Sequence, residues 1–156
     1  MLSDDTYRAK LRQTIASVQA WTGFVADVAR VEVTDQDTAW RIVMTPKSAN
    51  ACPVEIVLRN DRTYDLAMGG QTYVDRPLPS LDVVLPLLEA VAEGRVVTRR
   101  IASAATGLLR ERRTVVTLAD GTRFEAEETK PSLPAAAADA ATESSERHYL
   151  PYRRAG

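Results

Sequence analysis

The chain has 156 residues, and its 45% of hydrophobic residues is enough for one domain with its own core. A formal net charge of −1 argues against a protein whose whole surface is committed to nucleic acid or to an anionic membrane. The first residues do not resemble a secretory signal, and one cysteine excludes an intramolecular disulfide. We therefore expect a cytoplasmic protein without membrane contact, and its excess of arginine over lysine favours a bacterial source.

The N-terminal segment has the periodicity of an amphipathic helix. Its apolar residues recur at spacings of four, four and three, which places them on one face: Tyr7, Leu11, Ile15 and Val18. Ser3 is a suitable N-cap, and two aspartates follow it in the first turn. The pattern predicts a helix over Asp4–Ala20, with Gly23 as its C-terminal cap.

The next fifty residues change from a period near 3.6 to a period of two. Four runs alternate apolar and polar side chains: Ala29–Thr34, Trp40–Thr45, Val54–Arg59 and Tyr64–Met68. Turn-forming residues separate them, and Gln71–Asp75 is placed to pair back as a short strand. These runs predict an antiparallel meander of four to five strands with one covered face.

A second helix and a further two to three antiparallel strands follow the meander. Pro86 fits near the start of a helix that has Asp82 as its N-cap, and Gly94 ends that helix. Strands are predicted over Arg95–Ala102 and Leu108–Ala119. This element order predicts an α+β fold with both helices on one face of the sheet.

The dipeptide Asp120-Gly121 is the strongest hairpin signal in the chain, since it suits a two-residue type I′ turn. That turn would place Thr117 opposite Phe124 and Arg113 opposite Glu128. The face predicted to join the core is then Val115, Thr117, Phe124 and Ala126.

From residue 129 the composition shifts to alanine, serine, glutamate and proline, with few large apolar residues. We therefore expect one α+β domain over residues 1–128 and a flexible tail over 129–156. The tail ends in an aromatic-basic segment whose residues suit a docking peptide: Tyr149, Leu150, Tyr152, Arg153 and Arg154. A frayed terminus, or a segment that folds back onto its own domain or a partner subunit, is the alternative.

An arginine cluster is the other candidate binding feature. Its members fall on two strands predicted to pair, where they could bind phosphates or an acidic partner: Arg99, Arg100, Arg110, Arg112 and Arg113. The alternative is that glutamates of the next strand neutralise them, and no aromatic residues interleave as on a single-strand-binding face.

The residue types needed for common catalytic centres are sparse. The one histidine, His148, lies in the predicted tail, and no phosphate-binding glycine loop occurs. Cys52 is interpreted as a small buried hydrophobe, and Asp35 with Asp37 as turn residues. Trp21 and Trp40 fit a core more readily than a ligand pocket. We expect no enzyme activity, no cofactor and no metal site.

These features favour a non-catalytic protein-binding module, such as a chaperone, adaptor, immunity-type or regulatory protein. It would use the open sheet face or the tail, with another protein or a second copy of itself as its partner. Nucleic-acid binding through the arginine hairpin is the first alternative, and a small-molecule sensor with a pocket between helix and sheet is the second.

Overall fold

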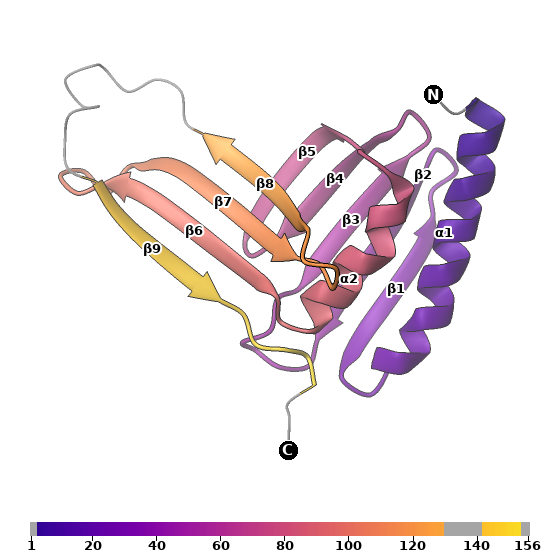
Figure 1. Cartoon of the computed structure of the whole chain (residues 1–156), viewed down its shortest axis with the longest axis horizontal. Helices are drawn as coiled ribbons and strands as arrows, with labels where there is room; N and C mark the ends of the chain where they lie inside the picture. Colours follow the sequence, from indigo (N-terminus) through magenta and orange to yellow (C-terminus); the bar gives the residue numbers. More distant parts are fainter. Residues whose placement is uncertain (1–2, 130–141, 154–156) are drawn as a thin grey trace.

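The structure, a computed structural model, describes residues 3–129 and 142–153. Within these residues, a five-stranded and a four-stranded antiparallel sheet share one hydrophobic core with two α-helices (Figure 1). The predicted α+β class and the order of helix, meander, helix and further strands are confirmed. No helix in the described part of the chain is long and apolar enough to cross a membrane.

The first sheet is a meander in which each strand pairs with the next along the chain. Its strands are β1 (Ala29–Asp35), β2 (Ala39–Pro46), β3 (Val54–Arg59), β4 (Thr63–Met68) and β5 (Gln71–Pro77). Alternate residues are buried, as the period of two requires, so that Ile42, Ile56 and Leu66 share the inner face. The strands predicted from the alternation are thus the strands observed.

Both helices pack on this inner face. Helix α1 (Asp4–Val25) buries the apolar stripe predicted for it, and Ser3 caps it by accepting the Thr6 N–H at 3.2 Å. The predicted end at Gly23 is wrong, because the helix continues through that glycine to Val25. Gly23 has no positive φ and no neighbour that would exclude a side chain, so nothing there stops the helix.

A 3₁₀ turn directly precedes the second α-helix. A short 3₁₀ turn, η1 (Leu81–Val83), is capped by Ser80 and leads into α2 (Val84–Ala92). Ser80 therefore replaces Asp82 as the side-chain cap. Pro86 lies in the first turn of α2, where its missing N–H forfeits no internal bond.

The second sheet has the order β8-β7-β6-β9 and packs one end against the inner face of the first. Its strands are β6 (Val96–Ser103), β7 (Leu109–Thr117), β8 (Arg123–Thr129) and β9 (Thr142–His148). The Tyr73 hydroxyl lies 3.2 Å from the Thr114 hydroxyl, and the rings of Tyr64 and Phe124 are 6.1 Å apart. The sequence predicted β6, β7 and β8 but neither β9 nor the division of the strands into two sheets.

The predicted register of the β7–β8 hairpin is wrong by one residue. Leu118 donates its N–H to Thr122, so the loop has three residues, and Gly121 has φ of +87°. This is the turn followed by a left-handed glycine that forms a bulge, not the two-residue type I′ turn. Val116 and Leu118 consequently enter the core in place of Val115 and Thr117.

The predicted flexible tail is also wrong for the part that the structure describes, while residues 130–141 lie outside it. Residues 142–148 form β9, which pairs with β6 over seven positions. Beyond it, Tyr149 and Tyr152 are 5% and 4% exposed and belong to the core. The segment has the folded-back alternative conformation, because its two tyrosines supply apolar area that the preceding residues lack.

Candidate functional site: a groove built by the C-terminal segment

The chain after β9 crosses the ends of several elements and joins them. Leu150 donates its N–H to the Asn50 carbonyl at 3.0 Å, and Tyr152 donates its N–H to the Ala92 carbonyl at 2.8 Å. The crossing depends on Gly94, which has φ of +77°. A Cβ atom there would lie 2.5 Å from the backbone nitrogen of Pro151. A glycine is therefore needed both for its backbone conformation and for the close approach.

Two side chains fasten this segment. The buried Tyr152 hydroxyl donates to the Cys52 carbonyl at 2.5 Å, and burial raises the pKa of this phenol. Arg153 binds both carboxylate oxygens of Asp27 at 2.7 Å and donates to the Phe24 carbonyl at 3.2 Å. The hydrogen bond from Arg153 lowers the pKa of Asp27 below its usual value. Of the last three residues of the candidate docking tail, Tyr152 and Arg153 therefore anchor the segment to its own domain, and Arg154 lies outside the described residues.

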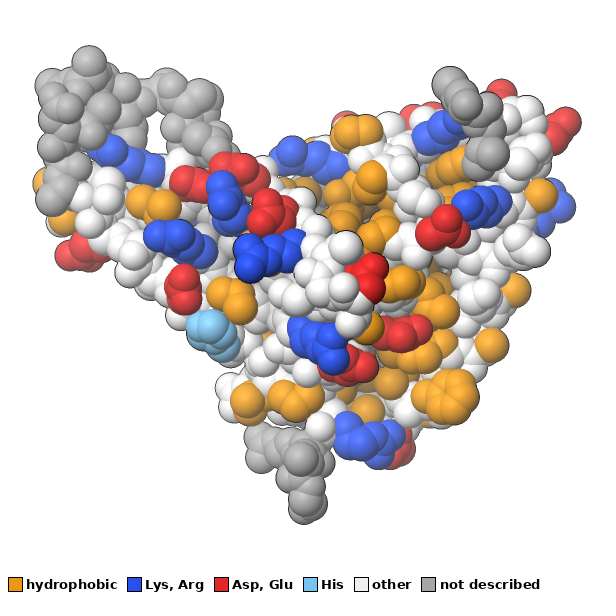
Figure 2. Space-filling model, viewed as in Figure 1, with side chains coloured by type: hydrophobic (Ala, Val, Ile, Leu, Met, Phe, Trp, Pro, Cys, Tyr) orange, Lys and Arg blue, Asp and Glu red, His pale blue; other side chains and the backbone are white. Residues whose placement is uncertain are grey.

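The anchored segment forms one wall of a groove of about 350 Å³, with the C-terminal ends of α1 and α2 as the other walls. We call it the C-terminal groove, and its lining is Trp21, Val25, Val28, Glu89, Ala92, Glu93, Pro151, Tyr152 and Arg153. Phe24, at the end of α1, is 75% exposed. Hydrophobic side chains gather on this face between α2 and the lower half of α1, with charged side chains at the margin (Figure 2).

The charges around the C-terminal groove favour a cation. Arg153 is neutralised by Asp27, and Glu93 lies 2.9 Å from Arg95. Glu89 makes no ion pair with any other described residue. In addition, α1 and α2 both direct their C-terminal ends here, neither has a basic residue in its last turn, and a helix C-terminus carries partial negative charge.

The fold brings the residues of the arginine cluster together on the paired strands β6 and β7, but their side chains are divided between the two faces of the second sheet. Arg99 pairs with Arg113 across β6 and β7, and Arg100 pairs with Arg112 at the next position, so the pairs point to opposite faces. Arg113 also lies 3.2 Å from Glu111 and 3.4 Å from Glu127. Arg110 also has an interaction partner. Figure 2 shows acidic and basic side chains interleaved over this sheet.

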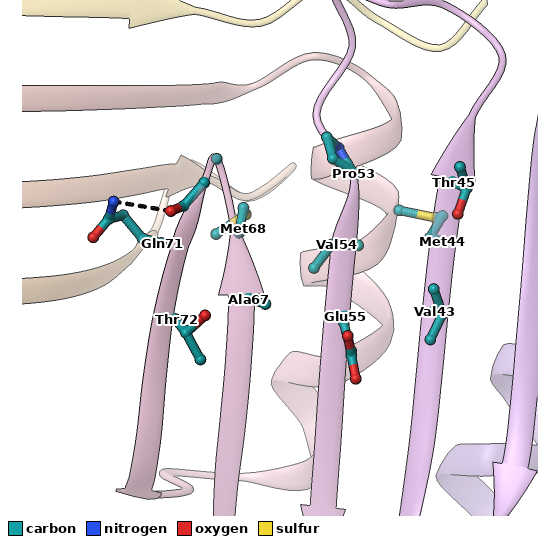
Figure 3. Close-up of a pocket in the computed structure, with 12 residues that line it drawn as sticks. Val43, Met44, Thr45, Pro53, Val54, Glu55, Ala67, Met68, Gln71 and Thr72 are labelled. Carbon is teal, nitrogen blue, oxygen red and sulfur yellow. Dashed lines mark hydrogen bonds between the residues drawn. The ribbon is translucent and has the colours of Figure 1, made fainter.

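The outer face of the first sheet carries no helix or strand of the described chain (Figure 1). One end of it is hollowed by about 350 Å³, where Val43, Thr45, Glu55 and Thr72 line the depression (Figure 3). Glu55 is held by Arg41 at 2.6 Å. The charge at the side of the depression is therefore already matched.

The remaining candidates have structural roles. Asp35 accepts the N–H of Asp37, which has a positive φ, so this pair serves the β1–β2 turn as predicted. Cys52 is fully buried, and desolvation raises its pKa to about 11. Trp21 and Trp40 are half-buried beside the core, and Trp21 also lines the C-terminal groove.

His148 is exposed at the end of β9, 3.4 Å from Glu146. Over residues 3–129 and 142–153, no three His, Cys, Asp or Glu side chains are grouped so as to hold a metal ion. No family model, curated protein or solved structure matches the chain.

Sequence reasoning did not find the C-terminal groove because its walls come from three distant segments, residues 21–28, 89–93 and 151–153. One local signal was present. Phe24 lies off the predicted apolar stripe of α1, and a large aromatic residue on a polar helix face is a candidate for binding. Only the fold shows that Arg153, in the wall of the C-terminal groove, binds the Phe24 carbonyl.

Proposed function

We propose that this protein is a non-catalytic protein-binding module that takes up a basic, partly aromatic or aliphatic segment of a partner in its C-terminal groove. The observation that carries the proposal is a groove lined by Trp21 and Tyr152, next to an exposed aromatic residue, Phe24, whose carbonyl binds the wall residue Arg153. Tryptophan and tyrosine are among the residues that contribute most to protein interfaces. An exposed apolar surface with a polar margin is typical of an interaction site.

The charge of the C-terminal groove supports a cationic partner group. A lysine or arginine side chain placed against Glu89 would gain a carboxylate partner, and the two helix ends add to the attraction. The apolar stem of such a side chain would lie against Val25 and Ala92. An acidic segment would meet two glutamates and would be repelled.

A selection from a random peptide library displayed on phage tests this proposal. We expect selected peptides to combine lysine or arginine with aromatic or aliphatic residues. Their affinity should fall at least about tenfold on Phe24→Ser and on Glu89→Lys, a loss of about 1.4 kcal/mol each. Val74→Ser is the matched control, because Val74 is an exposed apolar residue of β5 on the first sheet.

Each alternative to the groove predicts a different result. Peptides that bind both groove variants as well as the unchanged protein, or that are acidic, would overturn the proposal. Steep salt dependence with DNA or RNA, lost on Arg110→Glu with Arg112→Glu, would favour the arginine hairpin instead. Thermal stabilisation by a metabolite, with no peptide selected, would favour a small-molecule sensor.

A further inference from the structure

We propose that the protein forms a symmetric homodimer in which β9 pairs antiparallel with β9 of a second copy, joining the two four-stranded sheets into one of eight strands. Strand β9 is an edge strand of the second sheet and is drawn in yellow in Figure 1. All seven of its residues are exposed. The strand has no proline, no glycine and no bulge in its pairing with β6, so its free side is a regular backbone surface for another strand.

The backbone hydrogen bonds specify which registers are allowed. Tyr149 donates its N–H to Val96, which makes 149 and 96 a hydrogen-bonded pair in the β9–β6 register. By alternation, 147, 145 and 143 also bond to β6, while the N–H and C=O groups of 142, 144, 146 and 148 point to the free side. With a two-fold axis at Ser145, residues 144 and 146 of one copy pair with 146 and 144 of the other, and 142 and 148 pair likewise. Each of these outward N–H and C=O groups then has a hydrogen-bond partner in the second copy.

That register is complementary in charge. With the axis at Ser145, Glu143 of each copy lies opposite Arg147 of the other, which makes two ion pairs. Ser144 lies opposite Glu146 and Thr142 opposite His148, so no like charges face each other. A two-fold interface requires this kind of self-complementarity.

The other outer strands of the two sheets are less suited to pairing with themselves over their whole length. In β1 the axis would fall on Glu32, which would face its own copy. In β8 it would fall on Ala126 and would set Glu125 opposite Glu127. Strand β5 ends in Pro77 and has a register shift in its pairing with β4. Among the described edges, β9 is therefore the one suited to a second copy.

A charge exchange tests the dimer by sedimentation velocity over about 10 μM to about 1 mM, because a strand-pair interface is in the small, weak class. We expect the unchanged chain to approach twice its monomer mass as its concentration rises. Glu143→Arg should abolish this association, and the double variant Glu143→Arg with Arg147→Glu should restore it. The double variant removes Arg147, which lies 4.6 Å from the ring centre of the buried Tyr149. Circular dichroism should therefore check that this variant keeps its fold.

Cysteine cross-linking tests the axis itself. Two opposite residues at a non-hydrogen-bonded site have Cα atoms about 4.5 Å apart, within the range of a disulfide. Ser145→Cys should form a covalent dimer under mild oxidation, whereas the neighbouring Ser144→Cys, which faces Glu146, should cross-link at least about tenfold more slowly. The buried Cys52 does not compete. A monomer at every concentration, or equal cross-linking of both variants, would overturn the proposal.

Discussion

The two tyrosines of the C-terminal segment have different surroundings although both are buried. The Tyr152 hydroxyl donates to the Cys52 carbonyl, whereas the Tyr149 hydroxyl is buried without a hydrogen-bond partner in the described chain. A buried group left without its partner is destabilising, while removal of an unpaired one is not.

Phenylalanine substitutions separate these two situations. We expect Tyr152→Phe to lower the free energy of unfolding by about 1–3 kcal/mol, because the Cys52 carbonyl loses its partner. Tyr149→Phe is the matched control and should leave it within about 0.5 kcal/mol or raise it. Urea denaturation followed by tryptophan fluorescence measures both. Equal losses would contradict the assigned hydrogen bond.

Three glycines give a graded series of alanine substitutions. Gly94→Ala should cost most, well over about 1 kcal/mol, because it combines a positive φ with contacts to Pro151. Gly121→Ala, which has a positive φ but open space, should cost about 1 kcal/mol. Gly23→Ala, in the exposed interior of α1, should stabilise by about 0.5–1 kcal/mol. A different order in thermal or urea unfolding would contradict the described path of the segment over Gly94.

The buried thiol of Cys52 should be inert in the folded protein. Its pKa is about 11 because burial disfavours the thiolate, so almost none is ionised at pH 8. Ellman's reagent at pH 8 should therefore react only at the rate of unfolding. Because the pKa of Cys52 is higher in the folded than in the unfolded protein, its contribution to the stability of the fold is fully present below the unfolded pKa of about 9.0. This contribution is lost as the pH rises to about 11. Rapid labelling in native buffer would contradict the burial.

At the scale of elements, the alternation of the first sheet and the stripe of α1 were predictable because each depends on neighbours along one strand or helix. The hairpin register was not, since Asp120-Gly121 suits both a two-residue and a three-residue loop. Strand β9 was missed because its seven exposed residues have no apolar alternation. Its strand conformation comes from pairing with β6, which is a non-local interaction.

Removal of the C-terminal segment should destabilise the whole domain. A chain ending at Glu128 loses β9 and the buried side chains of Tyr149 and Tyr152, and we expect its free energy of unfolding to fall by more than about 3 kcal/mol. A chain ending at Arg153 is the control and should retain full stability. Urea denaturation monitored by circular dichroism compares them. An equally stable short chain would show that the segment is dispensable to the fold.

At the scale of the molecule, the C-terminal segment connects both proposals, since β9 leads directly into the wall of the C-terminal groove. Antiparallel pairing of β9 would place the two grooves of a dimer at opposite ends of the shared strands. A partner with two basic segments would then bind with higher avidity than a partner with one. The composition could not predict this arrangement, because it depends on which distant segments the fold brings together.

The most direct test of the C-terminal groove is a titration of the isotopically labelled protein with one selected basic-aromatic peptide, followed by amide and indole NMR shifts. We expect the changes to concentrate at the Trp21 indole and at residues 21–28, 89–93 and 151–153, while the Trp40 indole stays unmoved. Shifts confined to the outer face of the first sheet, or to the arginines of β6 and β7, would contradict the groove as the binding site.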